Sequence, residues 1–132
     1  TIGAVARDAA GHVAAGTSTG GITNQMPGRV GDSPLPGCGT YAADDSVAVS
    51  CTGIGEAFVR SVAAHQSRIC AVRRPVSAGA AQAALDDVAA RRGDGGVIVM
   101  PASGDGVIAY NSETMNYGYV TADGVRVVHG AE

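Results

Sequence analysis

Small residues dominate this chain and limit what it can fold into alone. Its 132 residues include 20 glycines and a single phenylalanine, although 45% of the chain is hydrophobic. Buried apolar surface contributes about 25 cal/mol per Å² to stability, and small side chains bury little area each. The length fits one domain or part of one. We therefore expect one unit over residues 1–132, of the α+β class, that forms half of a larger fold.

Charge excludes several classes of function. All nine basic residues are arginine, so neither a Schiff-base lysine nor a phosphate-binding P-loop lysine is present. A net charge of −3 argues against nucleic acid and anionic membranes as partners. No apolar run of membrane-spanning length and no signal-like segment is seen in the sequence. We expect a cytoplasmic protein without a cofactor.

Three cysteines, Cys38, Cys51 and Cys70, are odd in number and lack the spacing of a metal site. We interpret them as reduced, small apolar residues. No metal site is expected in this chain.

The first 19 residues are typical of a β-hairpin. Residues 1–8 alternate as a strand, and residues 12–19 alternate back. The loop between them ends on Gly11, which suits the left-handed position of a three-residue turn.

The register of this hairpin decides which residue faces Thr1. If Asp8 pairs with His12, Thr1 lies directly opposite Thr19, with both hydroxyl groups on one face. A two-residue turn would place Gly20 there instead. The alternative for Thr19 is an ordinary β-forming residue on a half-exposed strand.

Thr1 is itself a candidate nucleophile. A chain that starts on threonine has been trimmed experimentally or cut from a longer precursor. A terminal threonine carries its own base, because its α-amine reaches its hydroxyl and accepts protons near neutral pH. This is the N-terminal-threonine form of an activated nucleophile.

A long loop rich in glycine and proline follows, over residues 20–37, and loops of this length are usually functional. Arg29 and Asp32 bracket Val30 and Gly31 within it. A guanidinium fork for a carboxylate, with an anionic acceptor three residues later, suits the zwitterion of an α-amino acid. A local ion pair between Arg29 and Asp32 that pins the loop is the equal alternative.

Residues 46–52 alternate as another strand, which leads through Gly53 and Gly55 into a helix. Backbone N–H groups converge at such a turn and can hold an oxyanion. On spacing alone, a tight turn is the default interpretation. Glu56 favours the helix N-terminus by its charge and is interpreted as structural.

The remaining pattern predicts two helices on one face of an antiparallel sheet. The first helix covers residues 56–72, with His65 as a solvent-facing or capping residue, and the second starts near Ser77 as N-cap and ends at Gly93. Two further hairpins are expected, over residues 97–110 and 117–128.

Three stretches together carry a resemblance. They are Thr1–Ala6 with Thr17–Gly21, then Gly28–Pro34, then Val49–Glu56. In this order and spacing the chain resembles the β subunit of a plant-type L-asparaginase/isoaspartyl peptidase, an N-terminal-nucleophile hydrolase. The resemblance implies a four-layer αββα sandwich, shared with an α subunit cut autocatalytically from the same precursor, and an (αβ)₂ assembly.

The resemblance also implies catalytic roles. Thr1 would be the nucleophile and Thr19 would polarise its hydroxyl, while Thr52 and the backbone of Gly53 would form the oxyanion hole. Amide hydrolysis of L-asparagine or of β-aspartyl dipeptides would pass through a covalent β-aspartyl ester on Thr1.

Substrate binding would fall to the long loop and the glycine turn. Arg29 would hold the α-carboxylate of the substrate, and Asp32 its α-ammonium group. The complete candidate binding set is Arg29, Val30, Gly31, Asp32, Thr52, Gly53 and Gly55.

Two alternatives stay open. His12, residues 14–19 and residues 41–45 also resemble glycosylasparaginase, whereas Gly21 and residues 51–56 are closer to the asparaginase branch. The second alternative is a sheet domain without catalytic activity, whose Arg29 loop binds an amino acid.

Overall fold

A computed structural model of the chain describes residues 1–73 and 78–128. Its strands are β1 (Ile2–Arg7), β2 (Val13–Ser18), β3 (Thr40–Ala42), β4 (Val47–Gly53), β5 (Gly95–Pro101), β6 (Val107–Tyr110), β7 (Tyr117–Thr121) and β8 (Gly124–Val128). Its helices are α1 (Gly55–Ser61), α2 (Ala63–Arg73) and α3 (Ala78–Ala90).

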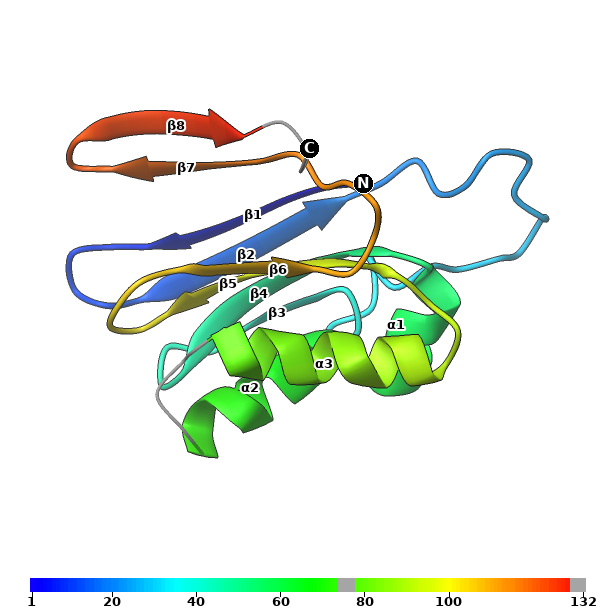
Figure 1. Cartoon of the computed structure of the whole chain (residues 1–132), viewed down its shortest axis with the longest axis horizontal. Helices are drawn as coiled ribbons and strands as arrows, with labels where there is room; N and C mark the ends of the chain where they lie inside the picture. Colours follow the sequence, from blue (N-terminus) through cyan, green and yellow to red (C-terminus); the bar gives the residue numbers. More distant parts are fainter. Residues whose placement is uncertain (74–77, 129–132) are drawn as a thin grey trace.

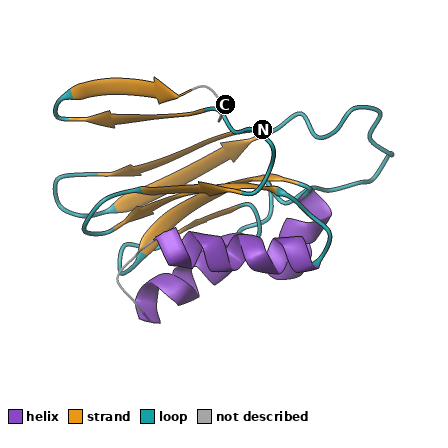
Figure 2. Ribbon diagram, viewed as in Figure 1, coloured by secondary structure: helices purple, strands orange, loops and turns teal. Residues whose placement is uncertain are grey.

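The elements form three layers (Figures 1 and 2). A four-stranded antiparallel sheet, in the order β3-β4-β5-β6, lies in the middle. The three helices cover one of its faces, and the β1–β2 hairpin covers the other. The β7–β8 hairpin lies beyond β1 on the same side (Figure 1).

The core lies between the helices and the middle sheet. Its largest fully buried apolar side chains are Phe58, Leu85, Val47, Val49, Val88 and Val97. Strand β4 is buried on both faces along most of its length, because helices pack below it and the β1–β2 hairpin packs above it. This double cover fixes β4 as the central element of the molecule.

The expected first helix is broken into α1 and α2. Val62 separates them in the left-handed conformation, with φ 49° and ψ 47°. The cause is tertiary, because the first N–H groups of α2 donate to loop carbonyls: Ala64 to Cys38 at 3.1 Å and His65 to Gly37 at 2.9 Å. The prediction of one helix over residues 56–72, and of two helices in all, was therefore wrong.

The three predicted hairpins are confirmed. Strand β3, which pairs with β4, was not predicted, because three residues are too short for a periodic signal. The strands form three separate sheets rather than one. The predicted N-cap Ser77 and the side chain of Cys70 lie outside the described residues, whereas Cys38 and Cys51 are free thiols.

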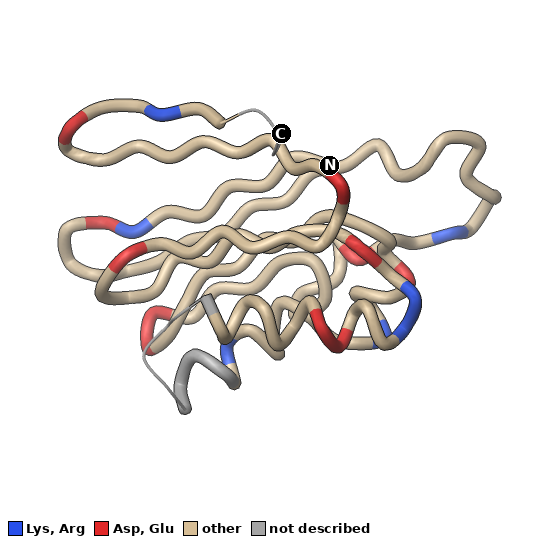
Figure 3. Tube along the Cα trace, in the orientation of Figure 1, with Lys and Arg blue, Asp and Glu red and all other residues tan. Residues whose placement is uncertain are grey.

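The outer hairpins expose apolar surface and few charges (Figure 3). Ile2 is 74% exposed on β1, and Val120 and Val125 are 75% and 70% exposed on β7 and β8. The chain thus supplies an α layer and two β layers, and no described helix covers the outer hairpins. No helix among the described residues has the length and apolar character needed to cross a membrane.

Candidate active site

The β1–β2 hairpin brings the two predicted threonines together. Ile2 pairs with Ser18 and Gly3 with Thr17, so Thr1 lies opposite Thr19 and the predicted register is confirmed. The Thr1 hydroxyl donates a hydrogen bond to Thr19 Oγ1 at 3.0 Å. Thr19 Oγ1 also accepts the backbone N–H of Gly21 at 3.1 Å, which fixes the direction of its lone pairs.

This threonine pair lies at the same end of the molecule as the end of β4. Strand β2 runs alongside β4 in the same direction, because the Val13 N–H donates to Asp44 near the start of β4 and Thr17 contacts Ser50 further along. Two residues beyond Ser50 is Thr52. Figure 1 accordingly shows the N-terminus, the long loop and α1 at one end of the sheet.

Two glycines make the end of β4 possible. Gly53, with φ 142°, pairs across the sheet with Gly95, with φ 157°. A Cβ atom on Gly53 would lie 2.1 Å from the carbonyl oxygen of Asp94, so only glycine fits. The neighbouring Ile54 N–H donates to the same oxygen at 3.0 Å, so this amide of the predicted turn is already satisfied.

Arg29 is held by a residue that the sequence did not suggest. Its Nε donates to Glu56 Oε1 at 2.7 Å and its Nη2 to Glu56 Oε2 at 3.0 Å, a bidentate pair. Its Nη1 donates to Gln25 Oε1 at 3.1 Å. The local ion pair with Asp32, the second reading of this loop, is not the one that forms: the described ion-pair partner of Arg29 is Glu56.

The electrostatics follow from this pair. The hydrogen bonds from Arg29 lower the pKa of Glu56 to about 2. The hydrogen bonds to Glu56 raise the pKa of Arg29 in turn. Glu56 therefore does more than favour a helix terminus, since it orients the guanidinium of the long loop against α1.

Asp32 is a buried carboxylate with an unused oxygen. Its side chain belongs to a residue only 6% exposed, and Oδ2 has no hydrogen-bond partner among the described residues. Burial raises the pKa of Asp32, although Arg29 acts in the opposite direction. A buried anion without a partner is costly, so this oxygen is suited to receive a cation.

The other candidate binding residues shape the space around these two side chains. A Cβ on Gly55 would lie 2.9 Å from Arg29 Nη2 and 3.0 Å from Asp32 Oδ1. A Cβ on Gly31 would lie 3.2 Å from Arg29 Nη1. Val30, which stands between Arg29 and Gly31 in the sequence, is 57% exposed. Gly31 and Gly55 thus leave room for the charged groups.

The sequence is similar to that of a known protein family. A family model described as asparaginase matches residues 1–129. The chain belongs to the asparaginase family. It is 49% identical over 119 residues to an isoaspartyl peptidase of Salmonella typhimurium, covering 87% of this chain and 37% of that protein.

Two further relatives have names of the same kind. The chain is 45% identical over 131 residues to the probable isoaspartyl peptidase/L-asparaginase 2 of Arabidopsis thaliana, covering 97% of this chain and 39% of that protein. It is 39% identical over 128 residues to the plant-type L-asparaginase of Pyrobaculum calidifontis, covering 96% and 43%. The asparaginase-family chain thus spans less than half of the length of these relatives.

His12 and His65, the two histidines among the described residues, lie away from the threonine pair. His12 closes the turn at the other end of β1 from Thr1, roughly 20 Å of extended chain away. Its Nδ1 contacts Asp8 Oδ2 at 3.0 Å, and this contact raises the pKa of His12 and lowers that of Asp8. His65, expected to face solvent or to cap the helix, is instead half-buried on α2 with its ring edge-on to Tyr41.

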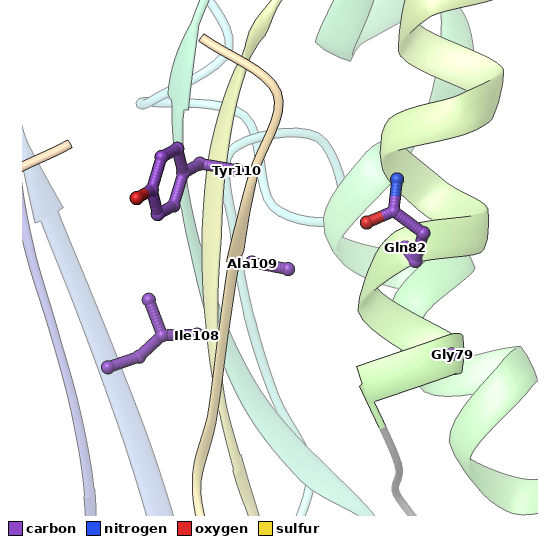
Figure 4. A pocket seen from close by; sticks show the side chains of 5 residues that line it. All are labelled: Gly79, Gln82, Ile108, Ala109 and Tyr110. Carbon is purple, nitrogen blue, oxygen red and sulfur yellow. The ribbon is translucent and has the colours of Figure 1, made fainter. Parts of the chain in front are cut away.

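An open groove lies at the sheet edge between α3 and β6. It has a volume of about 470 Å³ and contains none of the predicted site residues. Ala109 points toward α3, whereas Ile108 and Tyr110 point to the opposite face of the strand (Figure 4). Elsewhere in the described part of the chain, no three histidine, cysteine or acidic side chains gather as metal ligands would.

Proposed function

We propose that this asparaginase-family chain carries the nucleophile and substrate-binding half of an amidohydrolase that acts on the side-chain amide of L-asparagine and of β-aspartyl dipeptides. The observation that carries the proposal is the 3.0 Å contact between the Thr1 and Thr19 hydroxyl groups. Family membership and the names of the relatives agree with this chemistry.

Thr1 is the proposed nucleophile. Its Oγ attacks the side-chain carbonyl carbon, and its hydroxyl proton passes to its own α-amine. Before attack the Thr1 hydroxyl donates to Thr19; for the transfer its hydrogen turns to the α-amine, and Thr19 can then donate its own hydrogen to Thr1 Oγ. The α-amine then returns the proton to the departing ammonia or amino acid, and a β-aspartyl ester remains on Thr1. Water hydrolyses this ester and frees the enzyme.

Thr52 and Gly53 supply the oxyanion hole in this proposal, since the end of β4 lies at the threonine end of the hairpin. Donors that are already fixed in place stabilise a developing oxyanion without reorganisation. The glycine pair Gly53–Gly95 lets the backbone turn there without a side chain in the way.

Asp32 and Arg29 hold the two ends of the amino-acid group. Asp32, whose Oδ2 has no hydrogen-bond partner among the described residues, would neutralise the α-ammonium group. A guanidinium has five N–H groups, and within the described chain three of those on Arg29 are used by Glu56 and Gln25. The other two suit the α-carboxylate.

The proposal extends to the assembly. An α subunit from the same precursor would complete the four-layer sandwich, and two αβ pairs would associate. The exposed apolar hairpins support a partner on that side of the chain.

The test uses the complete protein that carries this chain, assayed with L-asparagine, a β-aspartyl dipeptide and a glycosylated asparagine side by side. We expect turnover of the first two, cleavage of the precursor before Thr1, and loss of both in Thr1→Ala. Preference for glycosylated asparagine would favour the glycosylasparaginase alternative. A Thr1→Ala variant that still hydrolyses amides would overturn the nucleophile assignment.

A further inference from the structure

A pair of hydroxyl groups joins the nucleophile hairpin to the middle sheet. Thr17 Oγ1 on β2 and Ser50 Oγ on β4 are 2.6 Å apart. Thr17 Oγ1 also donates to the carbonyl oxygen of Gly39 at 3.2 Å. Because the Thr17 hydrogen is used there, the Ser50 hydroxyl supplies the hydrogen between the two side chains.

Ser50 fits beneath the hairpin only because Gly3 has no side chain. Gly3 is the cross-strand partner of Thr17, two pairs along the hairpin from the Thr1–Thr19 pair. A Cβ on Gly3 would lie 2.1 Å from Ser50 Oγ. Ser50 itself is 3% exposed, so the contact is a closed, fully packed junction.

Gly39 connects the same junction to the substrate-binding loop. Its carbonyl oxygen accepts the N–H of Cys51 at 2.9 Å as well as the Thr17 hydroxyl. A Cβ on Gly39 would lie 2.7 Å from Asp32 Oδ2, the unpaired carboxylate oxygen. Gly39 therefore bonds to the hydroxyl pair and lies beside Asp32, the proposed ammonium site.

We propose that Ser50 and Thr17 are positioning residues of the active site: their hydroxyl pair, anchored on the Gly39 carbonyl, sets where Thr1 lies relative to Thr52 and Asp32. The inference rests on the proposed function and deepens it. Neither side chain contacts the reacting atoms, and both act through their neighbours. A misplacement of about 1 Å can cost on the order of a hundredfold in rate.

The first test removes each hydroxyl in the complete protein. Thr17→Val and Ser50→Ala are expected to lower kcat for a β-aspartyl dipeptide by roughly tenfold to a hundredfold. KM should change by no more than about twofold, because binding groups stay in place. Rates are taken per cleaved and folded site, by mass spectrometry and circular dichroism. Thr17→Ser keeps the hydroxyl and should recover most of kcat.

Ser67 offers a matched control. It is 1% exposed, and its hydroxyl donates to the Ala63 carbonyl at 3.0 Å within α2, on the far side of the sheet from the hairpin. Ser67→Ala therefore removes a comparable buried hydroxyl bond. It should lower the midpoint of thermal unfolding as Ser50→Ala does, while kcat per folded site stays at the wild-type value.

A second test exchanges volume across the junction. Gly3→Ala places a methyl group where Ser50 Oγ lies, so it should displace β1 and reduce kcat strongly. Adding Ser50→Gly removes the obstructing atoms and should restore part of the lost kcat. If the double variant is no faster than Gly3→Ala alone, Ser50 does not set the position of β1.

The outcomes separate this inference from the proposed function. Wild-type kcat in both Thr17→Val and Ser50→Ala, with Thr1→Ala inactive, would overturn the positioning role and leave the nucleophile intact. Turnover in Thr1→Ala would overturn the proposed function itself. Equal losses of kcat in Ser67→Ala and Ser50→Ala would also overturn the inference, because a general loss of packing would then explain both.

Discussion

Two side chains of the proposed site, Asp32 and Thr1, have unused hydrogen-bonding capacity. Asp32 is buried with one oxygen unpaired among the described residues, and the only described partner of the Thr1 hydroxyl is Thr19. An unsatisfied buried polar group opposes folding, so the unpaired oxygen of Asp32 calls for an explanation. We propose that Asp32 and Thr1 use this capacity to contact the substrate.

At Thr19 the prediction concerns rate without loss of fold. Thr19→Val removes the acceptor for the Thr1 hydroxyl but keeps the β-branched shape that suits a strand. We expect kcat to fall about tenfold to a hundredfold, the effect of one hydrogen bond at a reacting group. Kinetics and thermal unfolding of the variant check this. A variant with unchanged kcat would show that the contact is incidental.

At Asp32 we expect stability and binding to change in opposite directions. Asp32→Asn removes a buried negative charge whose pKa is raised by burial, so the midpoint of unfolding at pH 7 should stay equal or rise. KM should rise on the order of tenfold to a hundredfold, because a charge-assisted hydrogen bond to the substrate ammonium is lost. Lower stability combined with unchanged KM would assign Asp32 a structural role.

Among the elements, the loop after β2 and the start of α1 are joined by one ion pair. The bidentate contact between Arg29 and Glu56 is the described ion pair that links them. It lies beside Gly55, whose missing side chain leaves space for both charges of the loop. The position of the loop therefore depends on the protonation of Glu56.

The pH dependence of this link has a definite sign. The folded-state pKa of Glu56, about 2, lies below its ordinary value of 4.5. Its contribution to stability is therefore present above pH 4.5 and is lost as the pH falls toward 2. Glu56→Gln should lower stability at pH 7, and its difference from wild type should shrink between pH 4.5 and 2. Urea unfolding at several pH values measures this.

Glu113→Gln is the control for that series, because Glu113 is exposed and forms no ion pair with the described residues. Its difference from wild type should stay small across the same pH range. A Glu56→Gln difference that is constant from pH 7 to pH 2 would contradict the ion pair as the stabilising contact.

The sequence predicted features that depend on local patterns and missed features that depend on contacts between distant residues. The alternation of residues 1–19 and Gly11 gave the hairpin register, and hence the Thr1–Thr19 pair. The break at Val62 could not be predicted, because it depends on the carbonyls of Gly37 and Cys38, in a loop distant in the sequence. The Arg29–Glu56 pair was missed for the same reason: 27 residues separate the partners.

On the scale of the whole molecule, helices cover one side of the sheets, whereas the other side is uncovered in this chain. Helices cover the middle sheet below, whereas the outer faces of the β1–β2 and β7–β8 hairpins carry exposed small and β-branched residues. An apolar surface of this kind is typical of an interface. We place the proposed α subunit there.

This placement predicts which substitutions separate the subunits. Val120→Glu and Val127→Glu put a charge on side chains that are 75% and 63% exposed in this chain. In the complete protein they should weaken assembly, as seen by native mass spectrometry. Met26→Glu, at a position 76% exposed in the long loop, is the control and should leave assembly unchanged. Equal assembly in all three variants would place the interface elsewhere.

The nucleophile hairpin is held to the middle sheet at two places along its length. Its far end is clamped by the Arg7 Nη1, which donates to the carbonyls of Pro101 and Gly104 at 2.8 and 2.7 Å. A second contact, between Thr17 and Ser50, lies only two residue pairs from the end that carries Thr1. The amplitude at the tip of a beam grows with the length beyond its last support. From this short overhang we expect the thermal motion of Thr1 to be smaller than that of the hairpin segment between the two supports.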